Sequence, residues 1–149
     1  MAGFEWKYNL SGGRPLIQTF FMADTETLTK GDMVNLQSGE GDLAVTTDTA
    51  ILGVMQGAEN PDDEASSGVV AGTDSTTLIK VIVNPDAVYE DVDDTTARQP
   101  GATLDIAGTT GAQILATSSN TEFNVVERKR QATDPTRVVI MHALHPFNA

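Results

Sequence analysis

The sequence contains no cysteine. It can therefore form no disulfide bond, no thiolate nucleophile and no thiolate metal site. It also has no run of about 18 apolar residues, the length that a membrane-spanning helix requires. The first residues do not resemble a signal peptide, because Glu5 and Lys7 interrupt the apolar region that such a peptide needs. We therefore expect synthesis in the cytoplasm and no membrane partner.

Positive charge is scarce. The chain has 9 Lys and Arg against 21 Asp and Glu, which gives a formal net charge of -12. Between residues 31 and 97, Lys80 is the only basic residue. Binding to nucleic acid depends on clustered Lys and Arg that displace counterions from phosphates. The composition therefore argues against direct nucleic-acid binding and favours a partner with a positive patch.

Residues with catalytic or metal-binding potential are few. The two histidines, His142 and His145, have no third histidine and no following glutamate, so a structural role is favoured over zinc binding. The acidic clusters 62–64 and 91–94 lack the spaced ligands of an EF-hand, and an irregular calcium site is the alternative to a solvated turn. No serine lies in a Gly-x-Ser-x-Gly motif. We predict that the protein is not an enzyme, with no catalytic residue, metal ligand or cofactor.

Short apolar runs separated by Gly, Asp, Asn and Pro are typical of all-β proteins. The clearest strand signal is 77–83 (TLIKVIV), which is rich in β-branched residues and ends at Asn84. The predicted strands are 16–22, 33–37, 43–46, 51–55, 77–83, 87–92, 103–107, 112–117, 122–127 and 137–143. The polar segment 57–68 is predicted to be a surface loop. The number of short strands favours a closed or nearly closed antiparallel barrel or a sandwich, since closure leaves no unpaired edge.

Aromatic residues are also few, and five of the eight lie within the first 21 positions. Phe4, Trp6, Tyr8 and Leu10 alternate with polar residues, which predicts that they share one face of an extended strand. Ser11-Gly12-Gly13 then follows as a flexible connection.

This pattern predicts an N-terminal arm over residues 1–13 and a single β-domain over residues 14–149. Such an arm can add to the sheet of another chain, with its alternate side chains as anchors. The predicted anchors in the interface with that chain are Phe4, Trp6, Tyr8 and Leu10. An arm of this kind predicts that the body folds without residues 1–13. The alternative is an ordinary first strand followed by a Gly-rich turn.

Two further sets of residues are candidates for a subunit interface. Phe20 and Phe21 are adjacent, so in a strand they face opposite ways, one toward the core and one toward a neighbouring subunit. Arg128, Lys129 and Arg130 form the densest basic cluster in the chain. They either pair with acidic residues of a neighbouring protein or form an exposed turn.

Four stretches of the chain resemble a known family. They are 28–34 (LTKGDMV), 50–55 (AILGVM), 80–83 (KVIV) and 101–106 (GATLDI). Together with the acidic, cysteine-free and β-rich character of the chain, they resemble the head decoration (cement) proteins of tailed bacteriophages. The resemblance covers about residues 28–106 and marks no catalytic residue.

The resemblance implies a compact β-barrel or β-tulip body that forms a homotrimer. It implies binding to the major capsid protein on the outer surface of the expanded head, where the protein stabilises the shell against packaged DNA. It also implies that the N-terminal arm anchors this contact and that the protein is located in the virion. The chain is longer than the smallest such proteins, with 57–68 as the additional loop. The alternative function is a receptor- or glycan-binding β-domain of a virion or cell surface, assisted by calcium.

Overall fold

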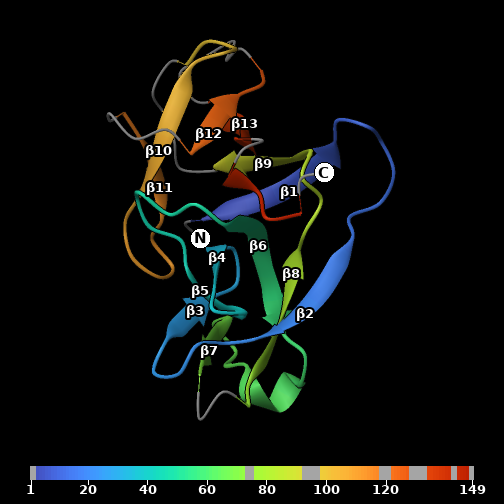
Figure 1. Cartoon of the computed structure of the whole chain (residues 1–149), viewed down its shortest axis with the longest axis vertical. Helices are drawn as coiled ribbons and strands as arrows, with labels where there is room; N and C mark the ends of the chain where they lie inside the picture. Colours follow the sequence, from blue (N-terminus) through green and yellow to red (C-terminus); the bar gives the residue numbers. More distant parts are fainter. Residues whose placement is uncertain are drawn as a thin grey trace.

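The computed structural model of the chain describes residues 3–72, 76–91, 98–117, 122–127, 134–141 and 144–147 (Figure 1). The strands of the first half are β1 (Phe4–Asn9), β2 (Ile17–Phe21), β3 (Thr27–Thr29), β4 (Met33–Gln37), β5 (Glu40–Leu43), β6 (Ile51–Ala58) and β7 (Val69–Ala71). Those of the second half are β8 (Leu78–Ile82), β9 (Ala87–Asp91), β10 (Thr103–Ala107), β11 (Ile114–Ala116), β12 (Phe123–Val125) and β13 (Thr136–Ile140). A short 3₁₀ turn, η1 (Pro61–Asp63), begins after the capping residue Asn60.

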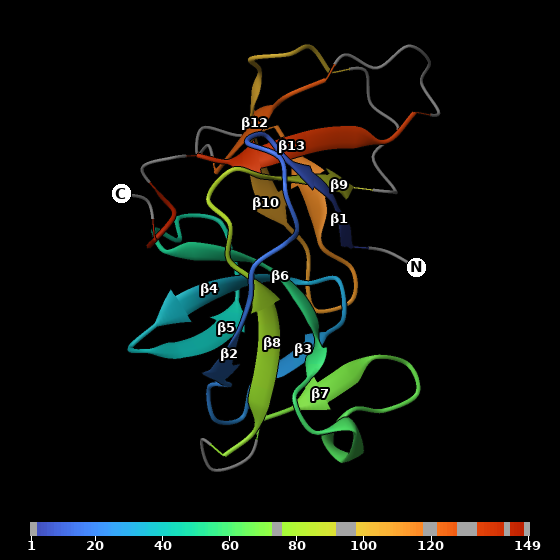
Figure 2. The ribbon, with the colours of Figure 1, turned by 90° about the vertical axis from the view of Figure 1, so that its right-hand side faces the viewer.

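The strands form two main sheets, one in each half of the molecule. The six-stranded sheet has the order β1-β9-β13-β12-β10-β11, and the five-stranded sheet has the order β2-β8-β6-β4-β5. A small third sheet pairs β3 with β7. The six-stranded sheet occupies the upper part and the five-stranded sheet the lower part of Figures 1 and 2. Every ladder between named strands is antiparallel, which confirms the predicted all-β antiparallel class.

Two hydrophobic cores hold these sheets together. The first joins the two sheets and includes Phe4, Tyr89 and Phe123. The second lies on the other side of the five-stranded sheet and includes Met22 and Leu28. Successive side chains of a strand point to opposite faces, so the central strand β6 contributes to both cores.

At Gly53 the alternation of side chains along β6 between the two cores shifts by one residue. Ile51 and Val54 belong to the first core, whereas Leu52 and Met55 belong to the second. This assignment is not a simple alternation, because the register with β4 shifts between Val34 and Asn35, next to Gly53. A β-bulge of this kind re-aims the side chains that follow it. The bulge therefore places Val54 in the first core and Met55 in the second, where strict alternation would have reversed them.

The two edge strands of the five-stranded sheet approach each other at one end. Met22 and Gly41 form an isolated parallel bridge, and the Ala23 N–H donates to the Gly41 carbonyl at 2.9 Å. Among the described residues this bridge is the only pairing between β2 and the end of β5. The structure therefore shows antiparallel sheets and does not show a closed barrel.

Most predicted strands are present with small changes of their ends. The strand predicted at 43–46 is observed as β5, which begins earlier in the chain, at Glu40, because the turn after β4 is tighter than expected. The predicted loop 57–68 was partly wrong, since its first two residues complete β6 and its centre forms η1. Strands β3 and β7 were not predicted, because three residues are too few to show a period of two.

The N-terminal segment is part of the body. Strand β1 pairs with β9 of the same chain, from Phe4 opposite Asp91 to Asn9 opposite Ala87. The prediction of an arm detached from the domain is therefore wrong for residues 4–9, which form an ordinary first strand. The reason is that the Phe4 side chain is buried in the core, where removing its aromatic ring from water stabilises the fold.

Candidate interaction surface

Strand β1 contributes both to the core and to the surface. Phe4 is only 2% exposed, and its ring stacks on Phe123 with centroids 5.9 Å apart. Its N–H donates to the Gly31 carbonyl at 2.9 Å, which ties β1 to the lower half of the molecule. Trp6 is half-buried against the same core, and its Nε1–H donates to Asn9 Oδ1 at 3.1 Å. Phe4 is therefore a core residue, whereas part of Trp6 faces solvent.

A β-bulge separates Trp6 from Tyr8. The register with β9 shifts between these two residues, so Tyr8 lies on the opposite face of the sheet from Phe4 and Trp6. There its hydroxyl donates to Glu127, and this hydrogen bond raises the pKa of Tyr8. The prediction that Phe4, Trp6, Tyr8 and Leu10 share one face is therefore wrong beyond Trp6.

The outer face around Tyr8 carries a network of ion pairs. Lys7 contacts Glu5 at 3.0 Å and Glu90 at 3.3 Å. Arg137 joins Glu90 to Glu127, with 3.1 Å to each carboxylate. Ion pairs at a surface contribute little individually, whereas a network fixes several side chains together. The network connects β1, β9 and β13 on this face.

A hollow lies between β1 and the lower half of the molecule. Its volume is about 280 Å³. We name it the β1 hollow and define it by the residues that line it, which are Phe4, Glu5, Trp6, Pro15, Lys30, Gly31, Met55, Gln56 and Ile82. Strand β1 is the last strand of its sheet, so the hollow opens beside a sheet edge. Aromatic and aliphatic side chains with a few polar groups are typical of a concave binding pocket.

A second apolar region begins where β1 ends. We call it the apolar strip, and it consists of Leu10, Leu16, Ile17 and Phe21, which are 56%, 54%, 46% and 48% exposed. The segment from Asn9 to Ala23 contains no acidic residue, in a chain with 21 of them. Four of the seven exposed large apolar residues in the described part of the chain therefore lie within residues 10–21, which makes this segment the strongest apolar candidate for an interaction site.

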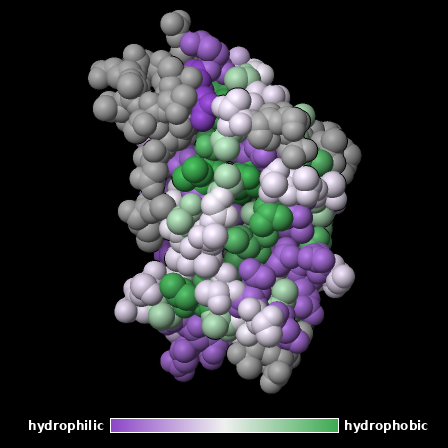
Figure 3. All heavy atoms as spheres, turned by 90° about the vertical axis from the view of Figure 1, so that its left-hand side faces the viewer, coloured by the Kyte–Doolittle hydropathy of each residue, from purple (hydrophilic) through white to green (hydrophobic). Residues whose placement is uncertain are grey.

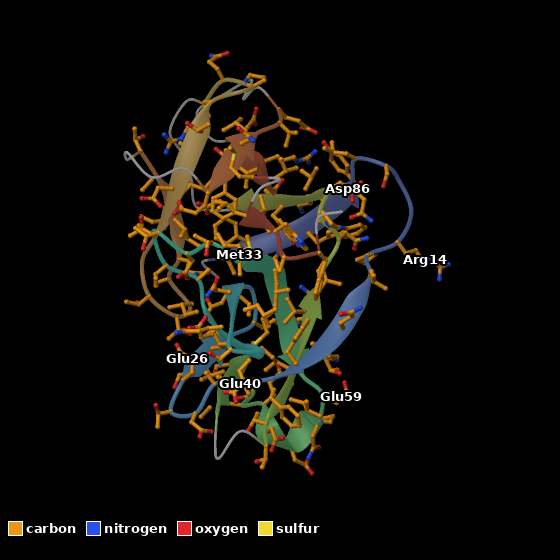
Figure 4. The ribbon with its side chains drawn as sticks, viewed as in Figure 1. Arg14, Glu26, Met33, Glu40, Glu59 and Asp86 are labelled. Atoms are coloured by element: carbon orange, nitrogen blue, oxygen red, sulfur yellow. The ribbon has the colours of Figure 1, made fainter. Side chains whose placement is uncertain are left out.

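The loop between β1 and β2 is held at both ends. The Ser11 N–H donates to Asp86 at 2.7 Å, and the Leu16 N–H donates to Asn84 at 2.5 Å. Burial raises the pKa of Asp86, but the hydrogen bonds from Ser11 outweigh it and lower the pKa below its usual value. Arg14 extends from the middle of this loop away from the body (Figure 4). The strip is therefore presented on a tethered segment.

Phe20 and Phe21 divide as their adjacency predicts. Phe20 is half-buried against the second core and stacks on Phe147, with ring centroids 6.3 Å apart. Phe21 is exposed on β2. Its contact with another subunit stays a prediction. The basic cluster Arg128, Lys129 and Arg130 lies outside the described residues, as does His142.

His145 has the structural role that the sequence favoured. It is buried, and its Nε2 lies 2.8 Å from the Leu52 carbonyl oxygen, to which it donates. Its Nδ1 accepts from the Phe147 N–H at 3.1 Å. The imidazole therefore holds the C-terminal segment against the lower sheet.

The exposed apolar residues elsewhere in the described part of the chain are more scattered. On the face shown in Figure 3, apolar patches lie among residues of intermediate hydropathy and are bordered by hydrophilic ones. Apart from the segment 10–21 and Phe147, two large apolar side chains are exposed among the described residues. They are Val45 and Ile114. Single exposed apolar residues are normal on soluble proteins. The sequence pattern missed Leu16, Ile17 and the β1 hollow, because none of them depends on a periodic signal.

A pair of buried carboxyl groups connects the two halves. Asp105 on β10 and Glu122, just before β12, are both buried. Glu122 accepts from the Thr47 N–H at 2.9 Å, and Asp105 accepts from the Thr46 hydroxyl at 2.8 Å. Burial, followed by the hydrogen bond with Asp105, raises the pKa of Glu122 to about 7. Such a shift is common in active sites, but neither carboxyl lines the β1 hollow, and both hold the loop that follows β5.

This pair makes the stability of the protein depend on pH. Glu122 binds its proton more tightly in the folded state, so its stabilising effect is present below the unfolded pKa of 4.5 and is lost as the pH rises toward 7. Asp42, whose pKa burial raises to about 6, acts in the same direction. We expect the free energy of unfolding to fall by about 1–2 kcal/mol between pH 5 and pH 7.5. Urea denaturation at a series of pH values measures it.

The variant Glu122→Gln tests the assignment. Its amide cannot titrate, so the slope of stability against pH should become flatter between pH 5 and 7. Glu40→Gln, which removes a carboxyl group at the first residue of β5 and outside this pair, serves as the control and should keep the wild-type slope. A Glu122→Gln protein with an unchanged slope would show that another group carries the dependence.

A metal site and a membrane-spanning helix have less support within the described ranges. No group of three or more His, Cys, Asp or Glu that could hold a metal ion occurs among the described residues. The described part of the chain also has no helix with the length and apolar character needed to cross a membrane. No protein-family model matches this chain, and comparisons with curated proteins and with solved structures give no match.

Proposed function

We propose that the protein is a structural capsid decoration protein that binds the outer surface of an expanded phage head. It would stabilise contacts between major capsid proteins there. Support comes from the resemblance of the four sequence stretches within residues 28–106 and from the acidic, all-β body. The observation that carries the proposal is a largely apolar hollow beside the last strand of a sheet, on a chain of net charge -12.

In this proposal the β1 hollow receives a side chain of the capsid protein. Trp6 forms one wall, and the exposed Leu10 lies at the end of the same strand. The acidic body guides docking onto a basic region, because complementary charge accelerates association and aligns the partners. The predicted interface residues Trp6 and Leu10 keep their role, whereas Phe4 acts from the core by holding β1 in place.

The finer description of the fold belongs to the same proposal. A β-barrel or β-tulip body is supported by the Met22–Gly41 bridge, which brings the two edges of the five-stranded sheet together at one end. A barrel that is open elsewhere would leave the apolar strip on its rim.

Filling the hollow tests the proposed function. Gln56 lines the hollow and is half-buried, so Gln56→Phe should occupy the space without removing a core contact. We expect its affinity for purified expanded heads that lack the protein to fall at least tenfold, measured by co-sedimentation. Gln37→Phe, at an exposed position on β4, is the matched control and should bind as the wild type does.

Trp6 provides a second readout, because it is the only tryptophan of the chain. Binding at the hollow should shift its fluorescence emission to shorter wavelength, as water leaves the indole. Raising the salt concentration should weaken binding, since salt screens the attraction to a basic surface. Unchanged binding of the Gln56→Phe protein to heads, or no binding by the wild type, would overturn the proposal.

A further inference from the structure

Among the described residues, strand β2 has unpaired backbone groups on one side over its first residues, before the Met22–Gly41 bridge. It is the last strand of the five-stranded sheet, and its ladder with β8 runs from Ile17 opposite Ile82 to Phe21 opposite Leu78. The Val83 N–H donates to the Leu16 carbonyl, and the Met22 N–H donates to the Thr77 carbonyl. Alternate residues of a strand direct their backbone groups to opposite sides. Ile17 and Thr19 therefore turn their N–H and C=O groups away from β8.

This edge lacks the features that usually protect an edge strand. Proteins block such edges with charged residues, proline or bulges. The sequence of β2, IQTFF, has no charged residue and no proline, and its ladder with β8 runs without a register shift. Ile17 and Phe21 of the apolar strip lie on the exposed face of this strand. Figure 2 shows β2 running beside β8.

We propose that β2 is a self-association site, at which a second copy of this chain pairs antiparallel along the same edge. The two-fold axis passes Gln18, so that Ile17 of each copy lies opposite Thr19 of the other. The outward backbone groups of Ile17 and Thr19 in both copies are then hydrogen-bonded. Beyond Phe21 the edge is occupied, because Ala23 bonds to Gly41, and this limits the pairing to the upper part of β2.

Charge identifies a second copy as the occupant. Two chains of net charge -12 repel each other over most of their surface. The segment from Asn9 to Ala23 contains no acidic residue and carries Arg14, so two copies can approach there with the least repulsion. A basic partner would be attracted mainly to the acidic faces of the protein and only weakly to this neutral strand. An isologous interface uses the same patch on both copies. Antiparallel pairing of the β2 edge with the same edge of a second copy meets this condition.

Cysteine cross-linking tests the register directly, since the natural chain has no cysteine. In the proposed pairing, Gln18 lies opposite Gln18 of the second copy in a non-hydrogen-bonded pair, with Cα atoms about 4.5 Å apart. That spacing lies within the range of disulfide bonds. Gln18→Cys should therefore give a disulfide-linked dimer on mild oxidation. Gln37→Cys, also exposed but on β4, should stay monomeric on a non-reducing gel.

Light scattering and analytical ultracentrifugation test the association itself. The wild type should be a dimer at tens of micromolar protein, and added salt should tighten it by screening repulsion. Thr19→Pro removes an outward N–H that bonds to no other described residue, so the fold should be kept while the dissociation constant rises at least tenfold. Val45→Ser removes an equally exposed apolar side chain outside β2 and should not change the dimer.

The inference does not rest on the capsid proposal, because no heads are needed for these measurements. Weak dimers form at protein concentrations on the order of 100 micromolar. A wild type that is still monomeric at this concentration would overturn the inference. So would a trimeric mass, which the phage resemblance implies instead. A dimer that resists Thr19→Pro, or a Gln18→Cys protein that does not cross-link, would place the contact elsewhere.

Discussion

Replacing Gly53 with alanine will destabilise the protein by about 4 kcal/mol or more, among the largest effects expected of a single methyl group. Gly53 has a φ of +149°, and an added Cβ would lie 2.0 Å from the Ile82 carbonyl oxygen and 2.3 Å from the Tyr89 hydroxyl. The backbone of β8 cannot move away without breaking its ladder with β6. Thermal unfolding should show a fall in Tm of roughly 10 °C.

The matched control is Gly101→Ala. Gly101 also has a positive φ, +84°, but no heavy atom lies within 4 Å of an added Cβ. Only the backbone strain remains, which costs about 1–2 kcal/mol. Equal losses of stability in the two variants would mean that β6 and β8 can separate at Gly53, and that the close approach does not limit the fold.

Removing residues 1–13 will destabilise the whole six-stranded sheet, contrary to what a detached arm predicts. The deletion exposes β9 as a new edge and leaves a cavity where Phe4 stacked on Phe123. Phe4→Ala alone should reduce the free energy of unfolding by about 3–5 kcal/mol, the usual cost of truncating a buried phenylalanine. Urea denaturation followed by circular dichroism measures both changes.

Leu10→Ala provides the control at the far end of the same segment. Leu10 is largely exposed, so its truncation should change stability by no more than about 0.5 kcal/mol. A truncated protein as stable as the full chain would restore the arm and would show that β9 tolerates an unpaired edge.

The strands were predictable where their residues carry a local signal. The segment 77–83 is β-branched and ends at Asn84-Pro85, so it was identified with nearly its observed bounds as β8. Segment 103–107 matches β10 residue for residue. The pairing of these strands could not be predicted, because it depends on contacts between residues far apart in the chain. The order β1-β9-β13 joins the first strand to the last through a strand from the middle.

The candidate site was predicted only in part, and β-bulges explain most of the difference. Simple alternation placed Tyr8 with Trp6, but the bulge between them moves Tyr8 to the other face, where it meets Glu127. The sequence pattern does not reveal a bulge, since the extra residue is an ordinary Lys7 and not a glycine. Phe20 and Phe21 were separated correctly, because no bulge interrupts β2.

The position of β9 between β1 and β13 determines when the protein can fold during synthesis. A ribosome releases the chain from its N-terminus, and β13 emerges after the other named strands because it follows them in the sequence. The lower sheet, complete once β8 is released, can form first, while β1 and β9 pair without their third neighbour. Until β13 arrives, the inner edge of β9 stays open to other nascent chains. Pairings between distant segments form slowly, so cellular yield should depend on how quickly translation proceeds from β9 to β13, on the order of a few seconds of synthesis.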